Sequence, residues 1–149
     1  MKWATRERIR MDRAASAWLI LRFVDKQAEF EFVPTKGALE LAQARQAIPF
    51  VIPGAELSRK EGKVTFDAIL EKYQLTDPAL YKLALIVREA DIGGDASVSP
   101  EAPGFRAILH GFFLLEMPDA DTLRLELPIF DALYRFCQGK HVLAYRANT

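Results

Sequence analysis

The chain has 149 residues, of which 50% are hydrophobic and 27% are charged, a composition typical of a globular domain. Twenty basic side chains balance twenty acidic ones, so the chain has no global positive field that would attract nucleic acid or an anionic membrane. A single cysteine, Cys137, excludes an internal disulfide, a CxxC redox motif and a cysteine-only zinc site. We therefore expect one domain over residues 1–149.

The N-terminal segment MKWATRERIRMDR is charged throughout and lacks the apolar core of a signal peptide. The most apolar run, AWLILRFV, is interrupted by Arg22 and is far shorter than the ~20 apolar residues of a membrane span. These features predict a cytoplasmic protein with no membrane partner.

The first half of the chain alternates between strand and helix patterns. Residues 2–8 predict a strand with Trp3, Thr5 and Glu7 on one face and Ala4, Arg6 and Arg8 on the other. Later segments then predict a helix from Asp12 to about Val24, a strand in AEFEFVP, a helix over about 36–46 and an extended IPFVIPG segment.

The second half is helical in character. We expect Thr65 to be the N-cap of a helix over FDAILEKYQ, and Asp77 with Pro78 to begin a helix over ALYKLALIVREAD. A loop, IGGDASVSPEAPG, then precedes the helices FRAILHGFFLLE and PIFDALYRFCQ, the second led by Pro128, and a loosely held tail follows Gly139. The fold class is therefore α+β, with a small N-terminal sheet of two or three short strands packed with a predominantly helical C-terminal half.

Positive charge is concentrated at the front of the chain. Arg6 and Arg8 share one predicted strand face, and Arg13 lies in the first turn of the next helix. Guanidinium groups and free helix N–H groups together suit a small anion. The alternative is that these arginines form ion pairs with Glu7, Asp12 or Glu29.

Asp12 and Ser16 open the following helix. Asp12 is placed to accept hydrogen bonds from the free N–H groups of its own first turn, as a capping residue does, and Ser16 follows one turn later. The pair Asp12–Arg13 is also a candidate rim of a binding site.

Three carboxylates form a second candidate group. Glu56 leads into a turn, Asp67 lies near a helix start, and Asp91 lies at a helix end, where its charge opposes the helix dipole. Arg88, three residues before Asp91, is its expected partner. If the three carboxylates converge, they suit a hard divalent cation such as magnesium or manganese.

The remaining titratable and aromatic side chains favour structural roles. His110 falls in an apolar helix pattern typical of a core or boundary histidine, and His141 lies in the tail. Cys137 reads as a buried small hydrophobe and not as a reactive thiol. The aromatic side chains expected in the core are Phe105, Phe112, Phe113, Phe130 and Phe136.

Stretches distributed in order over nearly the whole chain resemble the C-terminal domain of the chromate-resistance protein ChrB. They are KWATRER, DRAASAWLILRFVD, AEFEFVP, IPFVIPGAELS, TFDAIL, DPAL, IVREAD and FDALYRFC. Full-length members carry a further N-terminal region linked to control of a chromate efflux operon. Since this chain starts at the shared domain, we expect the DNA-binding part to be absent and nucleic acid not to be a partner.

The resemblance implies a family pocket with four departures in this chain. Members usually read Asp-Arg-x-Ala-Cys-Pro-Trp where this chain has Ser16 and Ala17, and they have His and Cys where it has Arg59 and Val64. Serine lacks a soft thiolate, and arginine replaces a metal ligand by a permanent cation. The positions that match are Asp12, Arg13, Trp18, Glu56, Asp67, Arg88 and Asp91.

Three functional hypotheses follow. The first is a chromate-resistance-associated domain that takes part in the response to chromate stress by binding a small anion, chromate or sulfate, through Arg6, Arg8, Asp12, Arg13, Arg59 and Arg88. The second is a metal-dependent enzyme that uses Glu56, Asp67 and Asp91 with magnesium or manganese. The third is a structural or interaction module with a degenerate site, forming a homodimer through the aromatic face of its last two helices.

Overall fold

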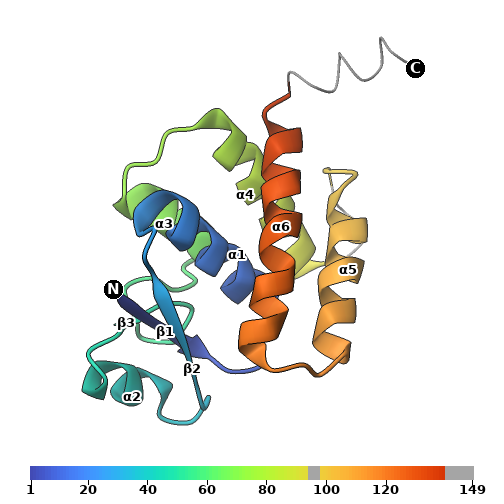
Figure 1. Cartoon of the computed structure of the whole chain (residues 1–149). Coiled ribbons are helices and arrows are strands. Elements are labelled where there is room, and N and C mark those ends of the chain that lie inside the picture. Colours follow the sequence, from blue (N-terminus) through green and yellow to red (C-terminus); the bar gives the residue numbers. More distant parts are fainter. Residues whose placement is uncertain (94–97, 140–149) are drawn as a thin grey trace.

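The computed structural model describes residues 1–93 and 98–139, and in this part of the chain a small sheet is followed by a helical C-terminal half, which confirms the α+β class (Figure 1). The strands are β1 (Lys2–Arg6), β2 (Glu29–Val33) and β3 (Ile48–Pro49). The helical segments are α1 (Met11–Leu19), the π-helical η1 (Ile20–Val24), α2 (Ala38–Ala44), α3 (Thr65–Lys72), α4 (Pro78–Ile92), α5 (Ala102–Leu114) and α6 (Asp119–Cys137). The tail after Gly139, with His141, and residues 94–97 of the predicted loop lie outside the described residues.

The three strands pair in parallel with β1 in the middle, in the order β2-β1-β3. Parallel neighbours need a crossover connection, and α1 with η1 supplies the one between β1 and β2. Alternate residues of β1 point to opposite faces of the sheet. Trp3 packs in the large core that includes α1, whereas Ala4 packs with Val33, Ala38 and Ala42 under α2.

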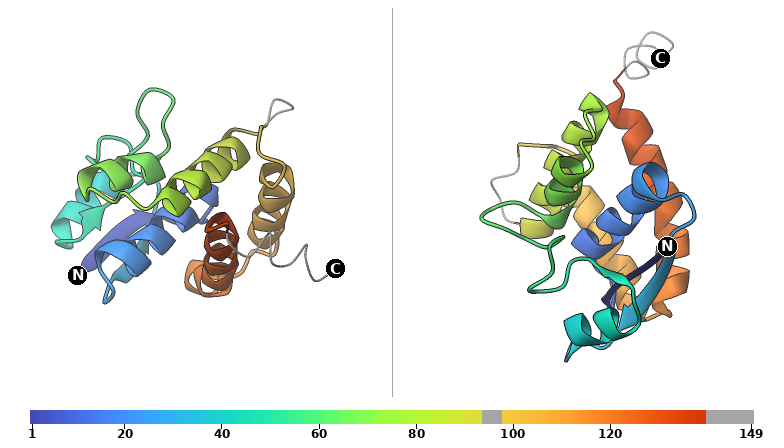
Figure 2. Two further views of the ribbon diagram at one scale, coloured as in Figure 1. Left: turned by 90° about the horizontal axis from the view of Figure 1, so that it is seen from above. Right: turned by 90° about the vertical axis from the view of Figure 1, so that its left-hand side faces the viewer.

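Helix α1 lies at the centre of the molecule, against α3, α4 and α6 (Figures 1 and 2). Every residue of α1 except Arg13 is buried. Its small side chains, Ala14, Ala15 and Ala17, let the surrounding helices approach closely. Because a central helix is covered on all sides, any polar group on it must find its partners inside the protein.

Two element boundaries at the front of the chain differ from the sequence prediction. Strand β1 ends at Arg6 and not at residue 8, because the chain turns at Arg8, which has a φ of 61°. Arg6 and Arg8 therefore do not share a strand face. The helix expected from Asp12 to Val24 begins at Met11 and widens into the π-helix η1 over its last five residues.

Of the two N-caps predicted from the sequence, the one for α4 is confirmed and the one for α3 is displaced by one residue. Asp77 caps α4 as expected, and its side chain accepts a hydrogen bond from the Ala79 N–H at 2.9 Å. The N-cap of α3 is Val64 and not Thr65, which is the first helical residue. Asp67 supplies the missing acceptor by reaching back to the Val64 N–H at 3.3 Å.

The last two helices begin earlier than predicted. Helix α5 starts at Ala102, inside the expected loop, and α6 starts at Asp119, nine residues before Pro128. Pro128 therefore lies within α6, where it lacks the N–H that would bond to the carbonyl four residues earlier. Burial of Leu123 and Phe130 on either side keeps the helix continuous through the proline. Within the described residues, no helix has both the length and the apolar content needed to cross a bilayer.

Candidate functional site

Asp12 does not cap its own helix. The N-cap of α1 is Arg10, for which no side-chain cap bond is found among the described residues. The Asp12 carboxylate instead accepts a hydrogen bond from the backbone N–H of Thr65, the first residue of α3, at 3.2 Å. The side chain is buried, because it lies on the face of α1 that packs against α3. Asp12 thus joins two helices that are 53 residues apart in sequence.

Arg59 bridges Asp12 and Asp91. Its Nε lies 3.5 Å from Asp12 Oδ2, and its Nη2 forms an ion pair with Asp91 near the end of α4. The expected partner of Asp91, Arg88, pairs with Asp67 of α3 at 3.1 Å. Arg88 is only three residues from Asp91 in sequence, but the tertiary fold pairs it with Asp67 and pairs Asp91 with Arg59.

The three carboxylates of the metal hypothesis do not converge. Asp67 and Asp91 are paired with different arginines, and Glu56 pairs with Lys72 at 2.8 Å. The hydrogen bond from Lys72 lowers the pKa of the Glu56 carboxyl, which is exposed to solvent. Over residues 1–93 and 98–139, no three histidine, cysteine, aspartate or glutamate side chains gather into a group that could hold a metal ion.

Four arginines gather in front of α1, and we call them the arginine cluster: Arg6, Arg8, Arg10 and Arg13. Arg6 donates to the Val51 carbonyl at 3.2 Å, and Arg13 donates to the carbonyls of Glu7 at 3.3 Å and Arg8 at 2.7 Å. The guanidinium groups of Arg8 and Arg10 lie 4.9 Å and 4.2 Å from the centre of the Phe113 ring.

Within the cluster, Arg13 is the arginine whose positive charge is disfavoured by its surroundings. Burial, and after it the positive charges of Arg6 and Arg10, lower the pKa of its guanidinium to about 10. Asp119 and Asp12 act in the opposite direction. Its Nε is buried without a hydrogen-bond partner among the described residues. The ion pairs expected for Arg13 are thus replaced by bonds to backbone carbonyls.

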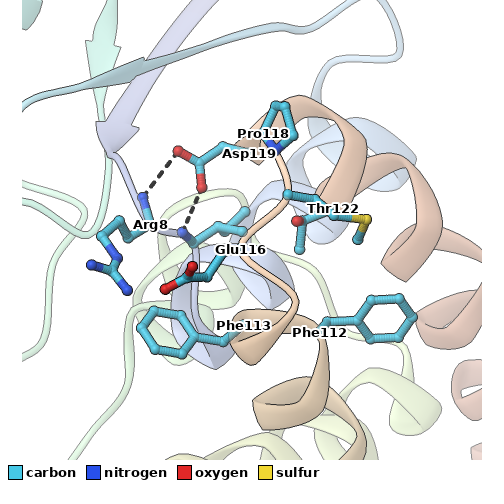
Figure 3. A pocket seen from close by; sticks show the side chains of 9 residues that line it. Arg8, Phe112, Phe113, Glu116, Pro118, Asp119 and Thr122 are labelled. Atoms are coloured by element: carbon cyan, nitrogen blue, oxygen red, sulfur yellow. Dashed lines mark hydrogen bonds between the residues drawn. The ribbon is translucent and has the colours of Figure 1, made fainter.

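A cavity of about 260 Å³ adjoins the cluster, between the start of α1 and the turn that joins α5 to α6 (Figure 3). Asp119 closes one side of it, accepting hydrogen bonds from the backbone N–H groups of Arg8 at 2.9 Å and Ile9 at 2.8 Å. Phe112 and Phe113 project from α5 to opposite sides. A smaller cavity of about 110 Å³ shares Phe113 and is lined by Arg10, Arg106 and His110.

Sequence reasoning missed three residues of this region, namely Arg10, Phe113 and Asp119. Asp119 follows Pro118 at the start of α6. A proline followed by an acidic residue is a known signal for a helix start, and it could have placed the beginning of α6 at Asp119. Phe113 and His110 were assigned to core or boundary positions, but His110 is exposed and stacks on the Phe113 ring at 6.0 Å.

The other predictions for aromatic and thiol side chains are confirmed for side chains that lie in the core and wrong for the one exposed to solvent. Phe105 and Phe130 are buried as expected, whereas the Phe136 side chain is exposed. Cys137 is buried, and burial raises the pKa of its thiol to about 11, so the prediction of a small core hydrophobe is confirmed. The thiolate form that thiol chemistry requires is therefore disfavoured.

Comparison with known protein families shows to which family the chain belongs. The family described as "ChrB, C-terminal domain" matches residues 3–137. This chain belongs to the ChrB C-terminal domain family. Protein ChrB of Cupriavidus metallidurans is 34% identical to this ChrB-family domain in an alignment of 139 residues that covers 89% of the chain and 40% of that relative. No solved structure matches the domain.

The structure brings together three of the four positions at which this ChrB-family domain departs from the expected family pattern. Ser16 lies one helical turn after Asp12, Arg59 forms an ion pair with Asp12, and Val64 directly precedes Thr65, whose N–H binds Asp12. These three departures therefore lie around one buried carboxylate and are not scattered over the surface. The arginine cluster is a different region, reached from the exposed side of the α1 N-terminus.

Proposed function

We propose that this ChrB-family domain serves chromate resistance by binding a small tetrahedral oxyanion, chromate or its isostere sulfate, at the arginine cluster. The observation that carries the proposal is the state of Arg13. Its guanidinium is partly buried beside Arg6 and Arg10, and its hydrogen bonds go to backbone carbonyls. An anion placed here would relieve the repulsion between like charges and supply the acceptor that Arg13 Nε lacks.

The N-terminus of α1 adds to the positive electrostatic potential of the arginine cluster. The first N–H groups of an α-helix carry a partial positive charge, and Arg10 at the N-cap adds a full one. Asp12, in the first turn, is directed away to α3. A dianion is therefore favoured by both the helix end and the surrounding guanidinium groups.

The ligand set is narrower than the one expected from the sequence. Arg59 and Arg88 are each engaged by aspartates, and Asp12 is engaged by Thr65 and Arg59. We therefore assign these three residues no contact with the anion. Arg6, Arg8 and Arg13 remain from the original set, and Arg10 joins them.

Replacing Arg13 by alanine should abolish stabilisation by oxyanions. At ~100 times its dissociation constant, a ligand adds about 2.7 kcal/mol to the free energy of unfolding, which corresponds to a rise of roughly 5–10 °C in Tm for a domain of this size. We expect that rise with sulfate and with chromate in the natural sequence, and none in Arg13→Ala. Differential scanning fluorimetry over a sulfate series measures it.

Arg45→Ala is the matched control for Arg13→Ala. It also removes one arginine, but Arg45 pairs with Glu31 of β2 and is not a member of the cluster. The sulfate response should persist in this variant. Retention of the full response in Arg13→Ala would remove the arginine cluster from anion binding.

Replacing Asp119 by asparagine should shift the sulfate affinity in the opposite direction. The carboxylate occupies the backbone N–H groups of Arg8 and Ile9, and its negative charge lies close enough to Arg13 to raise that pKa. Loss of one negative charge that repels the dianion through solvent-screened surroundings is worth about 1 kcal/mol, so sulfate should bind roughly fivefold more tightly. Calorimetric titration at low ionic strength measures the change, and unchanged or weaker binding would argue against a ligand beside Asp119.

A further inference from the structure

Buried oxygen atoms without partners lie on Asp12 and on two residues near it, on the side of α1 that packs against α3. Asp12 Oδ1, Ser16 Oγ and Thr65 Oγ1 are buried, and none has a hydrogen-bond partner within the described residues. The three residues as a whole are 4%, 0% and 0% exposed. Since burying a polar group without a partner costs about 1–3 kcal/mol, several such groups together need an explanation.

The backbone places these atoms at one junction. Asp12 and Ser16 are four residues apart on α1 and so lie on the same face. Thr65 begins α3, and its N–H already donates to Asp12 Oδ2, which leaves Oδ1 of that carboxylate free. We call this junction, with Arg59 and Asp91, the Asp12 corner.

Within the described residues, both carboxylates of the Asp12 corner have the same ion-pair partner, and Arg106, which also contacts Asp91, donates to its backbone carbonyl at 3.0 Å. Asp12 and Asp91 come from different helices and share the single guanidinium of Arg59. The two carboxylate side chains are 5% and 12% exposed, whereas the Arg59 side chain is 56% exposed. Arg59 thus reaches inward from a segment outside the helices, and it can leave the pair without disturbing the core.

We propose that the Asp12 corner is a site for one hard divalent cation, Mg²⁺ or Mn²⁺, held between the carboxylates of Asp12 and Asp91, and that Arg59 competes with it for the same place. All the available donors are oxygen atoms, which these cations prefer. Mg²⁺ keeps several of its waters and is commonly held by one or two carboxylates, so a third acidic side chain is not required. The hydroxyl groups of Ser16 and Thr65 would then coordinate the ion directly or form hydrogen bonds with its bound water molecules.

This site differs from the one expected from the sequence. Asp91 is common to both, but Glu56 and Asp67 are replaced by Asp12, because the fold pairs those two carboxylates with Lys72 and Arg88. The proposal does not rest on the arginine cluster, because Arg59 is not a member of it. Sulfate affinity and cation affinity should therefore respond to different substitutions.

Arg59→Gln is the decisive variant, since it removes the competing charge and keeps a side chain of similar length. We expect the variant to bind one Mn²⁺ per chain at least tenfold more tightly than the natural sequence. The electron paramagnetic resonance signal of free Mn²⁺, followed during a titration, measures both stoichiometry and affinity. Calorimetry with Mg²⁺ checks the same site.

Two further substitutions are made in the Arg59→Gln background. Asp12→Asn should abolish the tight Mn²⁺ site, whereas Glu56→Gln, which removes an exposed acid of the earlier set, should leave it unchanged. Since Asp12 also joins α1 to α3, circular dichroism must show that its variant is folded, and Asp91→Asn replaces it if it is not. Equal Mn²⁺ affinity with and without Arg59, no binding in either protein, or binding that survives both aspartate substitutions would overturn the proposal and leave the Arg59 bridge as a purely structural ion pair.

Discussion

Glutamine in place of Glu126 should stabilise the protein at pH 8 and leave its stability nearly unchanged at pH 5. Glu126 lies on α6 and is 2% exposed, and its Oε2 has no hydrogen-bond partner in the described part of the chain. Burial raises the pKa of its carboxyl from 4.5 to about 8. The side chain is thus favoured in its neutral, protonated form inside the folded protein.

The sign of the pH dependence follows from proton binding. Between pH 4.5 and 8, the folded protein keeps the Glu126 proton, whereas the unfolded chain has released it. The free energy of unfolding therefore falls as pH rises through this window, by as much as about 4 kcal/mol in total. For a domain of this size, that corresponds to a loss of roughly 10 °C in Tm.

Urea titrations of both proteins at pH 5, 6.5 and 8 test this expectation. Glu126→Gln should show a flatter dependence of unfolding free energy on pH, because its amide does not titrate. Asp121→Asn is the control on the same helix, since Asp121 is half-exposed and its substitution should not change the slope. Parallel pH profiles for Glu126→Gln and the natural sequence would show that Glu126 is ionised in the folded state.

Alanine in place of Trp18 should destabilise the protein by about 3–5 kcal/mol. Trp18 is 1% exposed and is surrounded by the rings of Phe23, Phe66, Phe130 and Tyr134, with centroid distances from 5.6 to 6.4 Å. Its indole N–H donates to Asp131 at 2.8 Å. Truncation would leave a cavity where η1, α3 and α6 meet.

Trp18→Phe separates packing from hydrogen bonding. It keeps an aromatic ring in the cluster but leaves the carboxylate of Asp131 without the indole donor, although Arg22 still pairs with it at 2.9 Å. We expect this variant to lose less than half as much stability as Trp18→Ala. Urea unfolding followed by far-UV circular dichroism measures both changes, and a loss below 1 kcal/mol in Trp18→Ala would mean that the neighbouring rings close the space.

Local signals were sufficient for several features of this fold. Alternation of polar and apolar residues located β1 and β2, helical spacing located α1 and α4, and the Asp77–Pro78 pair located an N-cap that the structure confirms. Each of these signals acts within about one turn or one strand. The boundaries at Arg8 and Pro128 were wrong, because a turn with positive φ and a proline inside a helix are decided by packing against distant segments.

The candidate sites were only partly accessible to sequence reasoning. Asp12, Arg13, Arg59 and Asp91 could each be identified as unusual, yet their partners could not. A salt bridge depends on which side chains meet in space, and Asp91 meets Arg59 instead of the closer Arg88. Arg10 was missed because nothing in the local pattern shows that Phe113, far along the chain, provides a ring for its guanidinium.

The amino-acid sequence by itself determined the family, the α+β class, the absence of disulfide chemistry and the set of charged residues at the front of α1. Those properties depend on residue identity, short-range spacing and order along the chain. Only the tertiary structure decided that Asp12 turns inward to Thr65 and Arg59, that Arg13 is left among like charges, and that the carboxylates Glu56, Asp67 and Asp91 separate. The physical reason is that burial and charge pairing are set by contacts between residues far apart in sequence, such as Lys72 with Glu56, 16 residues apart, and Asp119 with Ile9, 110 residues apart, which no local pattern encodes.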